Sequence, residues 1–327
     1  MIFFSYLKTI IGIGFLIFIH ELGHFIFCKI FRIPVAAFKI GRGTEIWSTL
    51  KKNTKYSIGL LPLGGYVAIG ESNNPEEEVS ILNERPWYQG ILVILGGILN
   101  NLLFTYFVII YATFFHSAEL SKTPIKLFVY QRSIQITNKS NNQIEALAYH
   151  STYDLFHTIE KEKKFLLPSK NTHISCTIET FKTIYDINYS NFTYGKTNTE
   201  KFFEGIKTTN NIIRINTMNL ISSIYSVNFK NFSGPIGIIK TCTNAAKEST
   251  LIFMIFLALI STSLAILNLL PIPIVDGGQL ILLLTHKIYG KKIPDRVQLV
   301  LTYGSFFMLA FITLYSTYND IIKFVFK

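Results

Sequence analysis

The stretch Phe18-Ile19-His20-Glu21-Leu22-Gly23-His24-Phe25 decides the fold, because it places polar side chains at the end of a long apolar run. On a helix, His20 and His24 lie one turn apart on the same face, where both imidazoles can ligate one zinc ion. Glu21 then stands beside the metal and can act as general base on a water molecule. Ionisable groups in a bilayer are costly unless they are paired or functional. The stretch therefore predicts a zinc site inside a membrane-spanning helix.

Hydropathy predicts four membrane-spanning helices in this chain of 327 residues, of which 49% are hydrophobic. The length allows one large membrane domain and a small polar insertion. The first span lacks a small-residue cleavage site and carries the metal motif, so it is not interpreted as a cleavable signal peptide. The four spans are roughly Ile2–Phe27, Ile91–Phe115, Leu251–Ile274 and Leu299–Tyr315.

The net charge of +11 reflects 25 Lys and only 6 Arg, in a chain that is also rich in Ile, Asn, Phe and Tyr. This pattern is more typical of a compositional bias than of an anionic partner. There is no Arg-rich cluster, so nucleic acid is not an expected partner. Cys28, Cys176 and Cys242 form no Cys-x-x-Cys motif, which excludes a zinc ribbon on sequence grounds. We expect free thiols, with a Cys176–Cys242 disulfide as the alternative.

Short basic loops predict the orientation of the chain in the membrane. The loop between the last two spans carries Lys287, Lys291, Lys292 and Arg296 against Asp295, and the segment after the first span is also basic. Both are expected on the cytoplasmic side. The N-terminus, the long loop between spans two and three, and the C-terminus then lie outside, with His20 and His24 near the cytoplasmic end of span one.

The segment between the first two spans contains a second apolar element. Lys29 to Tyr56 is expected to be irregular with strand-like patches, and Glu71 to Glu84 to be a solvated acidic linker. Between them, Ser57 to Val67 is apolar but too rich in Gly and Pro to span. Gly64-Gly65 is a hairpin-type turn signal, so we predict a re-entrant β hairpin that dips toward the metal. An ordinary surface hairpin is the alternative.

The insertion, Ser117 to Ser249, is polar and rich in Asn, Ser, Thr and Lys. Alternation predicts a strand over His173 to Ile178. An apolar repeat at helical spacing predicts an amphipathic helix, either on the outer membrane surface or packed on the insertion's own core. This repeat consists of Ile215, Met218, Ile221 and Tyr225.

A catalytic zinc site needs a third protein ligand, and three candidates present themselves. Asp276 follows Pro271 and Pro273, which interrupt the third span at the predicted depth of His24. Glu45 has a plausible spacing from His24 but sits among glycines and polar residues. His286 is a weaker candidate, because a lone His near a loop is usually structural. In span two, Gly96 and Gly97 allow close packing of helices, and Asn100 and Asn101 can hydrogen-bond across helices.

Taken together, these motifs resemble the site-2 protease family, specifically the bacterial branch that cleaves the membrane anchors of anti-sigma factors. The resemblance runs nearly end to end, and Val275 replaces the family's usual Leu. It implies that Asp276 is the third zinc ligand, that Asn268 holds the substrate backbone, and that Asn100 faces the active site. The motifs are Phe18 to Phe25, Leu61 to Val67, Arg85 to Gln89 with Gly96-x-x-x-Asn100, Ser233 to Ile238, and Asn268 to Gly278.

The expected fold is a four-helix membrane protein with a re-entrant β hairpin and a small extracytoplasmic α+β insertion of degenerate PDZ-like type. Residues 1–116 and 250–327 form the membrane core, and residues 117–249 form the insertion. The family's PDZ modules use Gly-rich turns, whereas Ile98 to Tyr194 contains no Gly, which weakens the expectation that this module captures peptides.

The expected activity is intramembrane zinc-dependent proteolysis, with Glu21 as base and His20, His24 and Asp276 as ligands. Gly64, Gly65, Asn100 and Asn268 are expected to contact substrate, and the partners are single-pass membrane proteins, including anti-sigma factors or remnant signal peptides, in the bacterial inner membrane. The rival interpretation is a membrane transport protein with a structural metal, since broken helices also occur in transporters.

Overall fold

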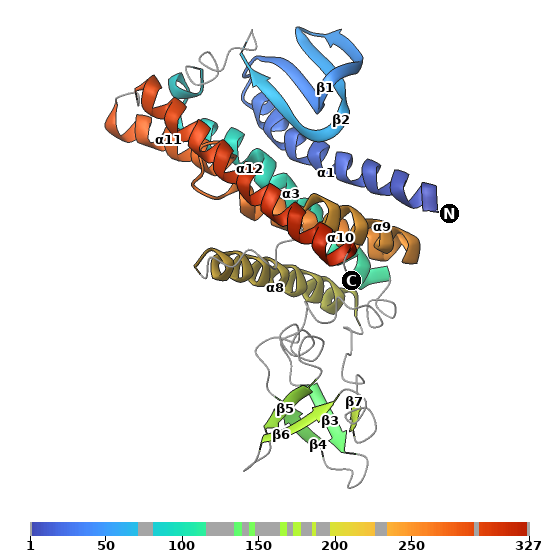
Figure 1. Cartoon of the computed structure of the whole chain (residues 1–327). Coiled ribbons are helices and arrows are strands. Elements are labelled where there is room, and N and C mark those ends of the chain that lie inside the picture. The colour runs from blue at the N-terminus through green and yellow to red at the C-terminus, as the bar shows by residue number, and fades with distance from the viewer. Residues whose placement is uncertain are drawn as a thin grey trace. The chain divides into compact units, whose positions relative to one another are not determined.

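The structure is a computed structural model that describes residues 2–70, 81–115, 197–225, 234–290 and 294–325, together with five short strands between residues 134 and 187. The chain divides into two compact units, Met1–Val108 with Asn216–Lys327, and Ile109–Ile215. The helices (Figure 1) are α1 (Ile2–Ile30), α3 (Trp87–Phe115), α8 (Asn198–Tyr225), α9 (Pro235–Glu248), α10 (Thr250–Asn268), α11 (Asp276–Tyr289) and α12 (Asp295–Val325). The strands are β1 (Val35–Lys51), β2 (Thr54–Ile69), β3 (Ile134–Asn138), β4 (Ile144–Leu147), β5 (Lys164–Pro168), β6 (His173–Thr177) and β7 (Tyr185–Ile187).

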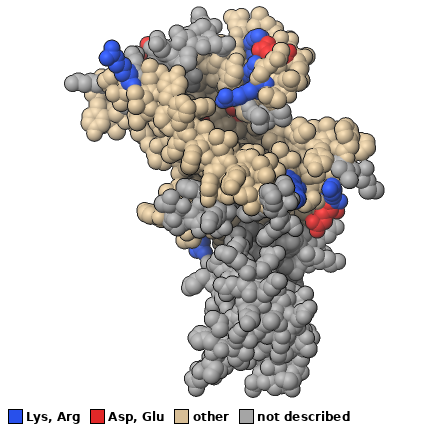
Figure 2. Space-filling model, viewed as in Figure 1, with Lys and Arg blue, Asp and Glu red and all other residues tan. Residues whose placement is uncertain are grey.

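Four helices are long and apolar enough to cross a membrane, over Phe3–Ile30, Trp87–Phe115, Thr250–Asn268 and Arg296–Ile322. Many of their large apolar side chains are exposed, including Phe3, Phe107 and Phe311 at 73%, 68% and 70%. Such surfaces are stable in contact with lipid. On the face shown in Figure 2, the described charged side chains gather over β1 and β2 and near helix ends, with an uncharged surface between them.

Helix α1 ends at Ile30, and the residues that follow it form a helix-terminating motif. Arg32 adopts the left-handed conformation with φ 54°. The backbone N–H of Ile33 then bonds the carbonyl of Cys28 at 2.8 Å, and that of Arg32 bonds Lys29 at 3.2 Å. This is a Schellman motif, and Pro34 prevents the helix from continuing. His20 and His24 therefore lie in the last three turns of a continuous helix.

Strands β1 and β2 cover the segment predicted to be irregular with strand-like patches and the predicted hairpin, but their pairing and turn differ from the prediction. The tight turn lies at Lys52-Asn53, both with positive φ, between the paired residues Lys51 and Thr54. Gly64 (φ 78°) instead bends β2. The two arms of the predicted hairpin do not pair with each other. They lie on either side of β1, where Lys39 has both Tyr66 and Ser57 as register partners.

The third predicted span is too long, because α10 ends at Asn268 rather than near Ile274. The chain then turns through the two prolines and starts again as α11, whose first residue is Asp276. The turn folds back tightly. A Cβ on Gly277 would meet the Leu270 carbonyl oxygen at 2.3 Å, and a Cβ on Gly278 that of Ile272 at 2.2 Å. Both glycines are required for this close approach.

The unit of residues 109–215 has two small antiparallel sheets, of order β4-β3-β7 and β5-β6. Strand β6 confirms the strand predicted at His173.

Helix α8 covers the whole predicted amphipathic segment and begins with a capping box, in which Thr197 and Glu200 bond each other's backbone N–H at 3.3 and 3.1 Å. About half of the predicted insertion and residues 71–80 of the predicted linker lie outside the described residues, whereas residues 81–84 form a helical turn. Cys28 and Cys242 are buried free thiols, and the side chain of Cys176 lies outside the described part of the structure.

Candidate metal centre

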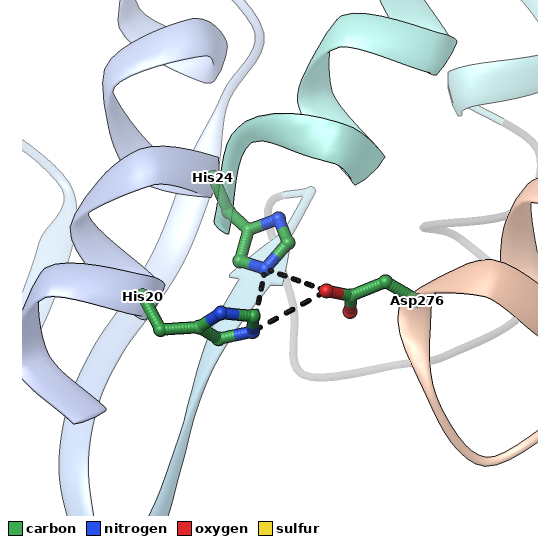
Figure 3. Close-up of side chains that lie close together, drawn as sticks. All are labelled: His20, His24 and Asp276. Atoms are coloured by element: carbon green, nitrogen blue, oxygen red, sulfur yellow. Dashed lines mark hydrogen bonds and ion pairs between the residues drawn. The ribbon is translucent and has the colours of Figure 1, made fainter. Parts of the chain in front are cut away.

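Three of the predicted site residues meet at one point between α1 and α11. His20 and His24 project from one face of α1, and Asp276 projects toward them from the first turn of α11 (Figure 3). Asp276 Oδ2 lies 3.3 Å from His20 Nε2 and 3.6 Å from His24 Nε2. The two Nε2 atoms are 3.3 Å apart. Within the described residues, these three form the only group of His, Cys, Asp and Glu side chains whose geometry can hold a metal ion.

The arrangement fits a zinc ion on the chemistry of its donors. One potential ligand atom from each residue lies within 4.8 Å of the others, and two imidazoles with one carboxylate is a known catalytic zinc set. Asp276 Oδ2 is buried and accepts no hydrogen bond of ordinary geometry. Its nearest partners are His20 Nε2 and His24 Nε2, which carry a compensating charge only when they are protonated. A buried carboxylate without a compensating charge costs several kcal/mol. A bound cation removes that cost.

The far side of the His24 ring is fixed by the neighbouring helix. His24 Nδ1 lies 2.8 Å from the backbone carbonyl of Val93 in α3. A carbonyl oxygen can only accept, so Nδ1 carries the proton and Nε2 presents its lone pair toward Asp276. Zinc-binding histidines are typically oriented in this way by a second hydrogen bond.

Glycines let α1 and α3 approach closely enough to build the site. A Cβ on Gly23 would lie 2.0 Å from the Gly96 carbonyl oxygen, so the two backbones touch. A Cβ on Gly97 would lie 2.5 Å from His24 Nε2 and 2.6 Å from His20 Cε1. Gly97 therefore leaves the space that the two imidazoles occupy. This role of Gly97 is more specific than the close helix packing predicted for the glycine pair.

Glu21 directly follows His20 in α1, and its side chain is buried, with an exposed fraction of 9%. Strand β2 passes directly over it. A Cβ on Gly65 would meet Glu21 Cγ at 2.7 Å and Glu21 Oε1 at 3.1 Å. Gly64 lies against the Arg42 side chain, whose Nε would be 3.1 Å from such a Cβ. The predicted approach of Gly64 and Gly65 to the site thus has a structural counterpart, although the strand pairing differs from the predicted hairpin.

The two predicted substrate-contacting asparagines lie on different sides of the site. Asn268, the last residue of α10, has its Nδ2 3.3 Å from His20 Nε2, on the side that faces the metal position. Asn100 Nδ2 donates to the backbone carbonyl of Ile19 at 2.9 Å and so ties α3 to α1. Asn101, for which the sequence indicated only a general bonding capacity, lies beside His20 instead, with its Nδ2 3.2 Å from His20 Nδ1.

Neither alternative ligand belongs to this cluster. Glu45 lies in β1 and forms ion pairs with Lys55 at 2.7 Å and Lys39 at 3.4 Å. The hydrogen bond from Lys55, with a smaller contribution from Lys39, lowers the pKa of Glu45 below its usual value. His286 lies in the last turn of α11, at the opposite end of that helix from Asp276.

The sequence matches the family model described as peptidase family M50 over residues 8–312, a range that includes α1, α3, α10 and α11. The chain belongs to this family, the site-2 proteases. It is similar along nearly its whole length to three bacterial proteins that each carry the name "Putative zinc metalloprotease". The relative from Fusobacterium nucleatum is 28% identical over 98% of this chain and 99% of its own length. Those from Campylobacter jejuni and Clostridium acetobutylicum are 28% and 29% identical, over 98% of this chain and 94% and 98% of their own.

Membership of family M50 makes this protein a zinc metalloprotease, and the four apolar helices make it an integral membrane protein. The match covers the metal cluster and the broken helix together. It therefore agrees with the geometry, which joins parts of the chain that lie about 250 residues apart in sequence. The resemblance first indicated by the ordered motifs is confirmed at the level of the family.

Proposed function

We propose that this protein hydrolyses peptide bonds within or near the membrane-spanning segments of single-pass membrane proteins. The observation that carries the proposal is the cluster of His20, His24 and Asp276, in which both histidines lie on a helix apolar enough to cross a membrane. A metal that served only as a structural tie would need no neighbouring base. Here the buried carboxylate of Glu21 directly follows the first His, as a hydrolytic site requires.

In this proposal His20, His24 and Asp276 hold the zinc ion, and three protein ligands leave a coordination position open for the reaction. When bound, zinc acts as a Lewis acid that polarises the peptide carbonyl and lowers the pKa of water. Glu21 takes a proton from the attacking water and returns it to the leaving amine nitrogen. The tight cover of Gly65 over Glu21 restricts the positions that this carboxylate can adopt.

The substrate must reach this site as extended backbone, because a helix hides its carbonyls in its own hydrogen bonds. We infer that the substrate segment lies beside residues 64–69 of β2, where an added strand would place its backbone next to Glu21. The amide of Asn268 is then available to hold a substrate carbonyl near the metal. Asn100, whose amide already bonds α1, contributes mainly by keeping His20 and its neighbours in register.

The site is proposed to face the cytoplasmic side of the bacterial inner membrane, with residues 117–249 outside the cytoplasm as a degenerate PDZ-like insertion. The basic residues around Lys287 and Arg296 support this orientation. The substrates then include anti-sigma factors or remnant signal peptides, which present a single membrane-spanning segment.

Co-expression with a single-pass membrane reporter, tagged at both ends, tests the proposal. Wild type is expected to release a shortened tagged fragment, and Glu21→Ala is expected to leave the reporter whole at equal expression. The transport alternative predicts no reporter fragment with either protein and no special role for Glu21. Equal fragment yields from wild type and Glu21→Ala would exclude the proposed base.

A further inference from the structure

Asn101 is a fully buried amide with only one of its two polar atoms in use. The residue is 0% exposed in α3. Its Nδ2 lies 3.2 Å from His20 Nδ1, while its Oδ1 is buried with no hydrogen-bond partner. An unsatisfied buried carbonyl typically costs about 1–3 kcal/mol. This cost would be removed in a second orientation of the Asn101 amide that gives Oδ1 a hydrogen-bond donor.

The position of the ring proton on His20 decides which atom of the Asn101 amide can face it. Asn101 Nδ2 lies 3.2 Å from His20 Nδ1, and Asn268 Nδ2 lies 3.3 Å from His20 Nε2. A neutral imidazole has one protonated and one accepting nitrogen, so it can accept from only one of these two amides, and it accepts from Asn101 only when its proton sits on Nε2. Nε2 is the atom that faces Asp276, and a protonated Nε2 cannot ligate a metal. For His20 to bind zinc as His24 does, its proton must lie on Nδ1, which then needs an acceptor.

We propose that Asn101 is a positioning residue that sets the tautomer of His20, by rotating its amide half a turn when zinc binds. The rotation brings Oδ1 to the place that Nδ2 occupies now, 3.2 Å from His20 Nδ1. Oδ1 then accepts from Nδ1–H, and Nε2 is free for the metal. An Asn can serve both tautomers because it carries a donor and an acceptor of nearly equal size. The inference rests on the zinc site of the proposed function.

Hydrogen bonds from α10 and from within α3 hold the backbone of Asn101 in place. The backbone carbonyl of Asn101 accepts from Ser261 Oγ at 2.9 Å and from Thr105 Oγ1 at 3.0 Å. Thr262 Oγ1 donates to Thr105 Oγ1 at 3.1 Å. All of these hydroxyl-bearing residues are 0% exposed. Such a satisfied buried network is rigid, so it fixes the distance between Asn101 and the His20 ring.

The test is the zinc affinity of the purified full-length protein, measured by competition with a chromophoric chelator. Asn101→Leu keeps the volume but removes the acceptor, and is expected to weaken zinc binding by about 10–100-fold. Asn101→Asp keeps an acceptor and is expected to bind zinc at least as tightly as wild type. Thr9→Val is the matched control, since Thr9 is a buried hydroxyl of α1 that bonds Ser5 and Thr243 rather than the site, and its zinc affinity should not change.

Wild-type affinity in a folded Asn101→Leu protein would overturn the proposal. Equal weakening in Asn101→Asp and Asn101→Leu would also overturn it, because a merely structural role would not distinguish the two. If Asn101→Leu does not fold, ¹⁵N-histidine NMR of the zinc-loaded wild type decides: a proton on His20 Nδ1 is expected, and an unprotonated Nδ1 contradicts the inference. Zinc affinity requires no substrate, so a protein that binds zinc as predicted but cleaves nothing would refute only the proposed function.

Discussion

At the scale of single residues, the space left by glycines matters as much as the ligands themselves. His20 and His24 can point at Asp276 only because Gly97 has no side chain, and Glu21 can lie under β2 only because Gly65 has none. The two glycines touch different parts of the site. Substituting each of them therefore separates metal binding from catalysis.

Gly97→Ala is expected to lower the zinc content of the purified protein well below one equivalent. The added methyl would lie 2.5 Å from His24 Nε2, where no Cβ can sit without displacing the ring. Metal analysis measures the effect. Gly304→Ala in α12 is the control, because a Cβ there meets nothing within 4 Å. Full zinc occupancy in Gly97→Ala would show that the imidazoles lie elsewhere.

Gly65→Ala is expected to keep zinc but to slow cleavage, since its Cβ would meet Glu21 Cγ and the Lys39 carbonyl oxygen, each at 2.7 Å, and neither is a ligand. Misplacement of a catalytic group by about 1 Å typically costs about 10²-fold in rate. The measurement is the rate of reporter cleavage at matched zinc content. Loss of zinc instead of rate would place Gly65 at the metal rather than at the base.

The helical period was sufficient to place His20 and His24 on one face of α1, with Glu21 next to His20, without knowledge of the rest of the fold. Spacing could not decide whether Asn100 or Asn101 contacts His20. Adjacent residues differ by about 100° around a helix, and the rotation of α3 relative to α1 is set by the contact of Gly23 with Gly96. In the structure it is Asn101 that contacts His20. The sequence had predicted only that Asn101 could hydrogen-bond across helices.

At the scale of elements, the break between α10 and α11 delivers the third ligand. The helix stops at Asn268, turns through two prolines and starts again at Asp276, so a carboxylate reaches the depth of two histidines on another helix. The broken helix was predictable from Pro and Gly. The pairing of β1 with β2 was not, since Gly64-Gly65 is a strong local turn signal but the observed turn uses Lys52-Asn53, and long-range pairing decided between them.

Asp276→Ala is expected to lose both zinc and activity, whereas Glu45→Ala is expected to lose neither. Asp276 is the only carboxylate in the described metal cluster, and the ion pairs of Glu45 with Lys55 and Lys39 are exposed. Exposed ion pairs contribute about 0–1 kcal/mol to stability, so Glu45→Ala should also fold normally. Metal analysis of both purified variants makes the comparison, and zinc retained by Asp276→Ala would mean that another group is the third ligand.

At the scale of the whole molecule, the four helices that are apolar enough to cross a membrane are the basis of the proposed topology. We propose that each of these helices crosses the membrane once, which would place both termini on one side together with the segment between α3 and α10. The basic residues between α11 and α12 favour the cytoplasm for the opposite side. The orientation thus rests on charge, which the fold alone does not set.

A single Cys at position Asn141, in a chain without its native cysteines, is expected to react with a membrane-impermeant thiol reagent added outside intact cells. A Cys placed at Lys291 should react only after the membrane is opened. The extent of labelling before and after lysis measures both. The reverse pattern would invert the topology and move the metal site to the outer side.

The measurement that tests the central claim most directly is made on purified Glu21→Gln, with zinc content and cleavage of a single-pass reporter determined on the same sample. The amide keeps the shape of Glu21 but cannot accept a proton as a base, and loss of a general base costs about 10²–10⁴ in rate. We predict wild-type zinc content with cleavage reduced by that factor. Wild-type cleavage by the zinc-loaded variant would contradict the account.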